Sequence, residues 1–438
     1  MIKPILLLVL ANTLLLLPGF SQNLKEQVDK KAKEIEEQVV AWRRDFHEHP
    51  ELSNREFRTA EKVAEHLKSL GIEVTTEVAH TGVIGILKGG KPGPVVALRA
   101  DMDGLPVTER VDIPFASKET SEYNGEEVGV MHACGHDTHV AILMGVAQIM
   151  SEMRDDLPGT VKFIFQPAEE GAPQGEEGGA ELMVKEGVMS NPDVDAIFGL
   201  HINSQTEVNQ IGYRPEGTMA SVDQLEIKIK GAQTHGAYPW GGVDPIVTAS
   251  QIVLGLQTIV SRNLEIIKAP AVVTIGKIDG GVRSNIIPEE VTMIGTIRAL
   301  DTEMQEKIHR RIREIATNIG ESAGAEVEVN ITKGYPVTYN DPELTAQMLE
   351  TLQETAGKEN ILLRYPVTGA EDFSFFAQEV PGLFFFLGGM PAGMNPEDAA
   401  PHHTPDFFID DSGLTLGVRA LSHLTLEYME QHEGEMGK

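Results

Sequence analysis

The nonapeptide MHACGHDTH, at residues 131–139, places three histidines, an aspartate and the only cysteine of the 438-residue chain close together. Imidazole and thiolate ligands suit zinc, manganese or cobalt better than calcium or magnesium. The spacing around Cys134 is not that of a zinc finger, so the plain alternative is a polar loop with scattered histidines. The rest of the chain favours a site for a transition metal.

Strand-like apolar stretches elsewhere in the chain lead to residues that can bind a metal. These stretches are 95–100, followed by Asp101 and Asp103; 161–166, followed by Glu169 and Glu170; 196–200, followed by His201; and 383–387, followed through a loop by His402 and His403. In parallel α/β sheets the carboxyl ends of the strands are where sites assemble. The pattern therefore predicts that these residues share one crevice with Cys134. The alternative for the two adjacent glutamates is that they lie on the surface, exposed to solvent, and have no catalytic role.

The pattern of apolar residues alternates between helices and strands over much of the chain. Helix-like periodicity covers residues 58–70 and 140–153, and strand-like runs cover 72–78 and 82–87. This alternation is typical of an α/β fold in which helices cover both faces of a mostly parallel sheet. We expect this fold for the part of the chain that carries the candidate metal-binding residues.

The pattern changes from about residue 217. Residues 224–230 alternate between apolar and polar side chains, as in an antiparallel strand with one exposed face. Similar strands are expected at 271–278, 291–298 and 325–331, with helices at 243–262 and 302–319. We therefore predict an inserted α+β domain with an antiparallel sheet at 217–332, between catalytic segments at 24–216 and 333–438.

Length and charge restrict the classes of protein to consider. The chain is longer than one hydrophobic core usually organises, which supports two domains. Its formal net charge is −30. Proteins that bind nucleic acid need basic patches, so this charge argues against a nucleic-acid partner. A small anionic substrate would need local cations in its binding site.

Residues 1–21 have the composition of a signal peptide. Lys3 supplies a basic start, residues 4–17 are apolar, and a small residue precedes a polar stretch. The apolar run is shorter than the roughly 20 residues that span a bilayer, so a membrane anchor is the second choice. We expect a periplasmic or secreted protein that leaves the membrane after cleavage. Its single thiol excludes an intramolecular disulfide, and metal binding would protect that thiol from oxidation.

A set of segments along the chain resembles those of one known superfamily. The segments are 99–106, 132–139, 167–171, 199–201, 369–373 and 403–405. They resemble the metallo-amidohydrolases of the aminoacylase and glutamate-carboxypeptidase superfamily, which include indole-acetyl-amino-acid hydrolases, hippurate hydrolases and N-acyl-amino-acid amidohydrolases. The match runs in order from about residue 39 to the C-terminus and leaves the substrate open.

The resemblance implies two divalent ions, Mn²⁺, Zn²⁺ or Co²⁺, and a set of residues that bind them. The implied ligands are Cys134, which bridges the ions, with His136, Glu170, His201 and His403. His403 is chosen over its neighbour because it precedes a small hydroxylated residue and a proline, as the family's histidine does.

The resemblance also implies roles for three acidic residues. Glu169 is the expected catalytic carboxylate, and Asp103 is expected to hold a ligand histidine in the correct tautomer. The wider superfamily has a metal-binding histidine where this chain has Asp101, so the role of Asp101 stays open. The roles of His132, His139 and Glu371 also stay open.

The inserted domain resembles the family's lid domain, which implies a homodimer formed through this domain. In that family a lid histidine, here His235, reaches a substrate carbonyl, often in the partner subunit. Asn285 and Arg298 match later lid motifs and are expected to contact substrate. A guanidinium group suits a free carboxylate, and the alternative for Arg298 is an ordinary surface ion pair.

The expected reaction is metal-dependent hydrolysis of an N-acyl-amino acid with an acetyl, benzoyl or indole-acetyl group, which yields a carboxylic acid and an amino acid. Two metal ions lower the pKa of a water molecule, and a carboxylate such as Glu169 transfers its proton. A dipeptidase or carboxypeptidase that uses the same site is a close second hypothesis. Two further hypotheses are a thiol amidase with Cys134 as nucleophile and His136 as base, and a metal-binding or solute-binding protein without catalysis.

Overall fold

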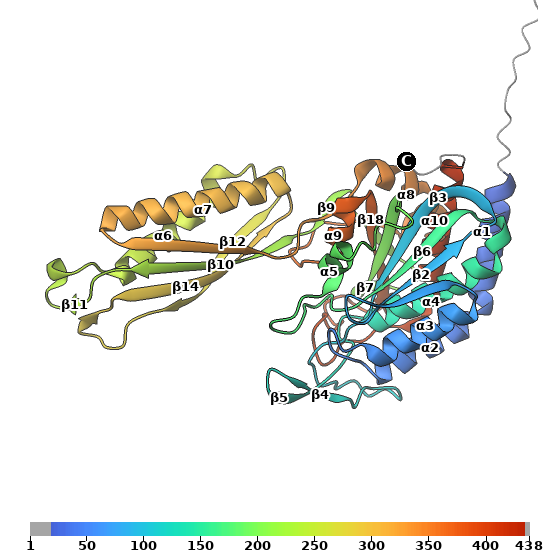
Figure 1. The fold of residues 1–438 in the computed structure, drawn as a ribbon, viewed down its shortest axis with the longest axis horizontal. Helices are drawn as coiled ribbons and strands as arrows, with labels where there is room; N and C mark the ends of the chain where they lie inside the picture. Colours follow the sequence, from blue (N-terminus) through green and yellow to red (C-terminus); the bar gives the residue numbers. More distant parts are fainter. Residues whose placement is uncertain (1–18, 434–438) are drawn as a thin grey trace, which may run out of the picture.

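The computed structural model describes residues 19–433, which form two parts built around separate sheets (Figure 1). Most of the expected signal segment at 1–21 lies outside the described residues. Among the described helices, none combines the length and the apolar composition needed to cross a bilayer.

The larger part contains a mixed sheet whose centre is parallel. Its strands lie in the order β1 (Glu73–Val78), β2 (Gly82–Lys88), β6 (Pro158–Gln166), β3 (Lys91–Asp101), β7 (Ala196–Glu207), β18 (Gly382–Met390), β8 (Ile211–Tyr213) and β17 (Ile361–Leu363). Strands β6, β3, β7 and β18 are mutually parallel. Their residues are almost all buried, as expected for parallel strands covered on both faces. The predicted mostly parallel sheet is thus confirmed.

Alternate residues of these strands enter two different apolar cores. Phe385 packs in the core formed with α1 (Gly19–Glu34), α2 (Glu36–Glu48), α3 (Phe57–Ser69), α4 (His136–Glu152), α8 (Pro342–Ala356) and α10 (Leu414–Gln431). Its neighbour Phe384 packs in the core formed with α5 (Gly179–Lys185) and α9 (Phe373–Glu379). This alternation follows from the two-residue period of a strand. Helices therefore cover both faces of the sheet, as predicted.

Helix α4 begins four residues earlier than the pattern at 140–153 predicts. Gly135 precedes it with φ of 93°, a left-handed conformation that glycine adopts without strain. Asp137 lies in the first turn, where a negative charge favours the helix dipole. His136 and His139 therefore lie on the first turn of this helix and not in a loop.

The smaller part is an antiparallel sheet with helices on one face. The strand order is β12 (Ala271–Asp279), β14 (Glu290–Ala299), β10 (Ser221–Lys230) and β15 (Glu326–Lys333). Buried Leu225, Ile227 and Ile229 face α6 (Pro245–Thr258) and α7 (Thr302–Ala323), and the polar residues between them face the open side. The predicted α+β domain is confirmed.

The two parts are joined beside a short antiparallel pair, β9 (Glu216–Met219) and β16 (Thr338–Asn340). A second short pair, β11 (Thr234–His235) and β13 (Ile286–Ile287), lies at the far end of the smaller domain (Figure 1). A hairpin of β4 (Thr120–Tyr123) and β5 (Glu126–Gly129) extends from the larger domain.

Candidate metal centre

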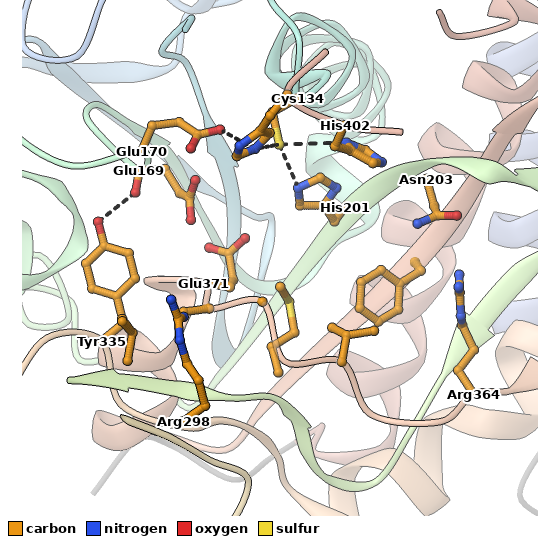
Figure 2. Close-up of a pocket in the computed structure, with 17 residues that line it drawn as sticks. Cys134, Glu169, Glu170, His201, Asn203, Arg298, Tyr335, Arg364, Glu371 and His402 are labelled. Atoms are coloured by element: carbon orange, nitrogen blue, oxygen red, sulfur yellow. Dashed lines mark hydrogen bonds and ion pairs between the residues drawn. The ribbon is translucent and has the colours of Figure 1, made fainter. Parts of the chain in front are cut away.

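The structure brings the five predicted metal ligands together at the carboxyl ends of the parallel strands. Figure 2 labels Cys134, Glu170 and His201 among them. Cys134 lies in the loop before α4 and His136 is the first residue of that helix, while His201 belongs to β7. Glu170 follows β6, and His403 lies in the loop after β18. The Cys134 Sγ atom is 3.4 Å from His201 Nε2 and 3.3 Å from His403 Nε2. His403 Nε2 is 3.1 Å from Glu170 Oε1.

The hydrogen bonds of two histidines leave a lone pair facing this cluster. His136 Nδ1 lies 2.9 Å from the backbone oxygen of Asp103, and His201 Nδ1 lies 2.6 Å from that of Ile202. Donation to a carbonyl requires the proton on Nδ1, so Nε2 is the free base in each ring. The buried Nε2 of His136 has no hydrogen-bond partner within residues 19–433. A metal ion is the natural acceptor of such lone pairs, and the thiol, imidazole and carboxylate donors fit transition metals.

His402 and His403 differ in how they face the cluster. The Nε2 atom of His402 accepts a hydrogen bond from the Ser204 backbone N–H, and its Nδ1 lies 3.8 Å from Cys134 Sγ. His403 is closer to the sulfur and also contacts Glu170. The geometry therefore favours His403 as the ligand.

The other two histidines of the nonapeptide are not directed at the cluster in the same way. His139 Nδ1 lies 2.5 Å from Asp101 Oδ1, and its Nε2 accepts from the Ile202 backbone N–H. Both ring nitrogens are thus engaged by protein groups. His132 is fully buried, and burial lowers its pKa to about 4. Its ring nitrogens lack hydrogen-bond partners in the part of the chain that the structure describes.

Asp103 connects a ligand histidine to the backbone of both glutamates. Its carboxylate lies 3.2 Å from His136 Nδ1 and accepts from the Ser53 hydroxyl at 2.7 Å. It also accepts the backbone N–H groups of Glu169 and Glu170. Burial raises the pKa of Asp103, but the contacts with His136, Ser53 and the Glu170 backbone together outweigh burial, and the net shift is downward. An ionised Asp103 therefore supports the tautomer of His136 that leaves Nε2 free.

A turn allows the adjacent Glu169 and Glu170 to face the same site. Ala168 has φ of 54° and Gly171 has φ of 103°, so the backbone is not extended on either side of the pair. Glu170 reaches His403, whereas Glu169 Oε2 lies 3.8 Å from His136 Nε2. The backbone therefore turns on each side of the pair, and both side chains reach the site.

The surroundings of Glu169 also shift its pKa. Burial, followed by repulsion from Glu371 and Glu170, raises the pKa of Glu169 well above its usual value. A carboxyl group in such surroundings holds a proton readily and is suited to general acid and base catalysis. Burial also raises the pKa of the Cys134 thiol, whereas a bound cation would stabilise the thiolate.

A buried arginine that the sequence interpretation did not assign organises the floor of the site. Arg99 lies 2.6 Å from Asp101, 2.9 Å from Glu371 and 2.9 Å from Asp372. Burial raises the pKa of Asp101, but Arg99, His136 and His139 together reverse the shift and hold the pKa well below its usual value. Asp101 and Glu371 thus act as partners of Arg99. The sequence signal for this role was an arginine within the apolar run that forms β3.

A cavity of about 440 Å³ opens beside the metal ligands. Tyr335 and Arg298 line one side and Asn203 and Arg364 line the other, with Glu371 between them (Figure 2). Asn203 lies two residues after His201 in β7, so both side chains lie on the same side of that strand. This spacing was the one sequence signal for Asn203, and neither Tyr335 nor Arg364 was predicted.

The structure does not bring His235 and Asn285 to this cavity. Both are exposed near β11 and β13, at the end of the inserted domain that is far from the metal ligands (Figure 1). Their proposed contacts with substrate stay predictions. Arg298, by contrast, lies on the open face of the antiparallel sheet and faces the cavity.

Comparison with known proteins identifies the family. Residues 97–427 match the model of peptidase family M20/M25/M40. The chain belongs to this family. It is 40% identical to thermostable carboxypeptidase 2 of Saccharolobus solfataricus, over 93% of this chain and 99% of that protein. It is 36% identical to N-acetylcysteine deacetylase of Bacillus subtilis, over 91% and 98%.

The fold of this chain also matches that of a solved member of the family. A dinuclear metal-binding M20 peptidase from Bacillus subtilis superposes with a TM-score of 0.76, at 34% identity, over 91% of this chain and 99% of that one. The chain is therefore a metal-dependent hydrolase of amide bonds with a dinuclear centre. When bound, the two ions supply Lewis acidity that polarises the amide carbonyl and acidifies water.

Proposed function

We propose that the protein hydrolyses the amide bond of N-acyl-amino acids and releases a carboxylic acid and a free amino acid. The observation that carries this proposal is the position of Arg298 across the cavity from the metal ligands. Within residues 19–433 no carboxylate lies within ion-pair distance of Arg298. Asp223, which acts on its charge from farther away, is itself bound by Gln305 and His309, so the guanidinium is available to the carboxylate of an amino acid.

Glu169 transfers the proton in this proposal. It takes a proton from the attacking water and returns it to the leaving nitrogen, because its carboxyl group lies in the cavity beside the metal ligands, 3.8 Å from His136 Nε2. The Tyr335 hydroxyl donates to the Glu169 backbone oxygen at 2.7 Å and holds this segment in place. The leaving nitrogen and the amino acid attached to it therefore lie on the side of Tyr335 and Arg298.

A carboxypeptidase reaction is the second candidate, since one similar protein carries that name. Arg298 would bind the C-terminal carboxylate of a peptide in the same way. The two candidates differ at the acyl end, where a dipeptide carries a free amine and an N-acyl-amino acid does not.

The test is a substrate panel. The protein without residues 1–21 is stripped of metal and assayed for amino-acid release from N-acetyl, N-benzoyl and indole-acetyl amino acids and from dipeptides, with and without Mn²⁺, Zn²⁺ or Co²⁺. Metal-restored release from acylated amino acids supports the proposal. Release from dipeptides alone supports the peptidase, and no release by the metal-loaded protein refutes both.

We further propose that the native ions are Mn²⁺, Zn²⁺ or Co²⁺. The support is the mixture of one sulfur donor, several imidazoles and a carboxylate, which calcium and magnesium do not favour. Elemental analysis of the protein purified without added metal tests this proposal, and calcium or magnesium as the sole bound ion would refute it.

We also propose a homodimer formed through the inserted domain. This domain exposes large apolar side chains along α6 and edge strand β12, among them Leu254, which is 71% exposed, with Ile246, Val247, Val272 and Ile278. Exposed apolar patches of this kind mark protein interfaces. A partner would also offer the distant His235 a route to a metal site other than that of its own chain.

Sedimentation at micromolar concentration tests the dimer. Leu254→Glu places a charge in the apolar surface and is expected to yield monomers. Phe57→Glu is the matched control, because Phe57 is 63% exposed but lies on the larger domain. A monomeric wild-type protein, or dissociation by the control variant alone, would refute the arrangement.

Finally, we propose that residues 1–21 direct export to the periplasm or beyond, on the basis of their basic start and apolar run. Fractionation of cells that express the full chain or the chain from residue 22 tests this. Equal retention of both forms in the cytoplasm would contradict it.

A further inference from the structure

The side of the cavity opposite Arg298 has its own cation and its own amide donor. Arg364 and Asn203 line it together, on the same side of the cavity in Figure 2. We propose that this side binds a carboxylate on the acyl group, so that the preferred substrate is the monoamide of a dicarboxylic acid with an amino acid. This inference rests on the proposed hydrolysis of N-acyl-amino acids and specifies its acyl group.

A chain of hydrogen bonds orients both side chains. Arg364 Nη1 donates to the Thr206 hydroxyl at 2.7 Å, so that hydroxyl directs its own proton to Asn203 Oδ1 at 2.8 Å. Asn203 Oδ1 also accepts from the Gln205 backbone N–H. The amide oxygen of Asn203 is therefore occupied, while its NH₂ group has no acceptor among the described residues. Two donors, the NH₂ group and the guanidinium, remain for a ligand.

Packing holds the guanidinium of Arg364 in place before a ligand arrives. Its Cζ atom lies 5.2 Å from the centre of the Phe386 ring, and the Arg364 backbone bonds to Tyr213 and Arg214. A donor that is already positioned loses less entropy when it binds a ligand. The guanidinium is thus a built part of the cavity wall.

The charges around Arg364 are unbalanced locally. The chain has 66 acidic and 36 basic side chains, yet none of the described carboxylates lies within ion-pair distance of Arg364. The acidic residues of the cavity lie near other groups: Glu371 pairs with Arg99, Glu170 contacts His403, and Glu169 lies 3.8 Å from His136. A half-buried guanidinium without a counter-ion favours an anionic ligand, and its planar fork suits a carboxylate.

The position of Glu169 decides which half of the substrate lies here. The leaving nitrogen must be on the side of Glu169, whose backbone oxygen is bound by Tyr335. The acyl group then extends the other way, toward Asn203 and Arg364. In the reaction a C–O bond forms from water to the acyl carbon and the C–N bond breaks. Both water protons go to the nitrogen, and the products are a dicarboxylate and an amino acid with a protonated amine.

The experiment compares two acyl groups of similar size on the same amino acid. The metal-loaded protein is assayed with the N-succinyl and the N-(4-methylpentanoyl) derivatives, whose acyl ends are a carboxylate and an isopropyl group. The proposal predicts kcat/KM at least about tenfold higher for the succinyl derivative, since a hydrogen-bonded charge is worth about this factor or more. Equal or faster cleavage of the neutral derivative would overturn it. Cleavage of neither by a protein that releases amino acid from the N-acetyl or N-benzoyl derivatives would overturn the acyl-group assignment and leave the proposed function standing.

Variants distinguish binding from a structural role. Arg364→Gln is expected to lower the succinyl preference at least tenfold through a higher KM, Asn203→Ala to lower it less, and Arg364→Lys to retain part of it. Arg298→Gln should reduce kcat/KM for both derivatives by similar factors. Arg419→Gln, on α10, is the control that keeps the wild-type ratio. If Arg364→Gln and Asn203→Ala reduced both derivatives equally, the two residues would be structural and the proposal would be wrong.

Discussion

Asp103 lies 3.2 Å from Nδ1 of His136 and binds the backbone of both neighbouring glutamates with the same carboxylate. One side chain thus sets the tautomer of a ligand and the position of the turn beside it. Asp103→Asn is expected to weaken metal binding by about 10- to 100-fold, as for other residues that orient a ligand histidine. Competition with a fluorescent chelator measures this affinity directly. An unchanged affinity would show that His136 is oriented by the Asp103 backbone oxygen alone.

Glu169 and Glu170 are adjacent but have different expected roles. Glu169→Gln removes the proton carrier and should lower kcat by about 10²- to 10⁴-fold while the metal content stays the same. Glu170→Gln removes a ligand and should lower the metal content itself. Elemental analysis of both variants beside their kinetics tests the distinction. Loss of metal from Glu169→Gln would assign that residue to the ligands.

Removal of the metal separates the metal mechanism from a thiol mechanism. Chelation should abolish activity, and Mn²⁺, Zn²⁺ or Co²⁺ should restore it, because the ions supply the Lewis acid. Iodoacetamide should alkylate Cys134 only slowly in the stripped protein, because burial raises the pKa of this thiol, and should not alkylate it in the metal-loaded protein. Mass spectrometry follows the modification. Activity that survived chelation but not alkylation would favour Cys134 as a nucleophile.

Arg99 should be essential for stability because three buried carboxylates contact it. Arg99→Met leaves them without a cation and is expected to lower the free energy of unfolding by about 3–5 kcal/mol. Arg99→Lys should recover only part of this loss, since an ammonium group cannot bridge the three carboxylates as a fork does. Urea unfolding measures both variants. A Met variant as stable as the wild type would mean that the carboxylates take up protons at little cost.

Asp29 should contribute a pH-dependent part of the stability through α10. Burial raises its pKa, but hydrogen bonds from His423 and Arg419 outweigh burial and lower the pKa to about 2 from 3.8. A lowered carboxyl pKa stabilises the folded state above about pH 4, and this contribution is lost as the pH falls through about 2. Asp29 and Arg419 are partly exposed, so their ion pair contributes at most about 1 kcal/mol to the free energy of unfolding.

Urea unfolding of Asp29→Asn at several pH values tests this prediction. The difference in unfolding free energy from the wild type should be largest above pH 4 and should vanish near pH 2. Asp155→Asn, at an exposed aspartate without an ion pair in the described chain, is the control and should show no such trend. A difference that stayed constant down to pH 2 would contradict the linkage.

Local patterns in the chain were sufficient for the fold class and for the residues that gather at the metal centre. The two-residue period of β10 and the apolar runs of β6, β7 and β18 depend on which face of a strand is buried, and that can be read from neighbouring residues. Because parallel strands end at one edge, strand-end residues such as Glu170 and His201 could be predicted to meet.

Contacts between distant segments were decided only by the tertiary structure. No local pattern relates Arg99 to Glu371 or Asn203 to Arg364, since these pairs meet through the order of strands in the sheet. The same holds for His235, which lies far from the metal ligands of its own chain because the inserted domain is extended. Periodicity records which side of an element is buried, whereas a partner across the fold depends on how the elements are stacked.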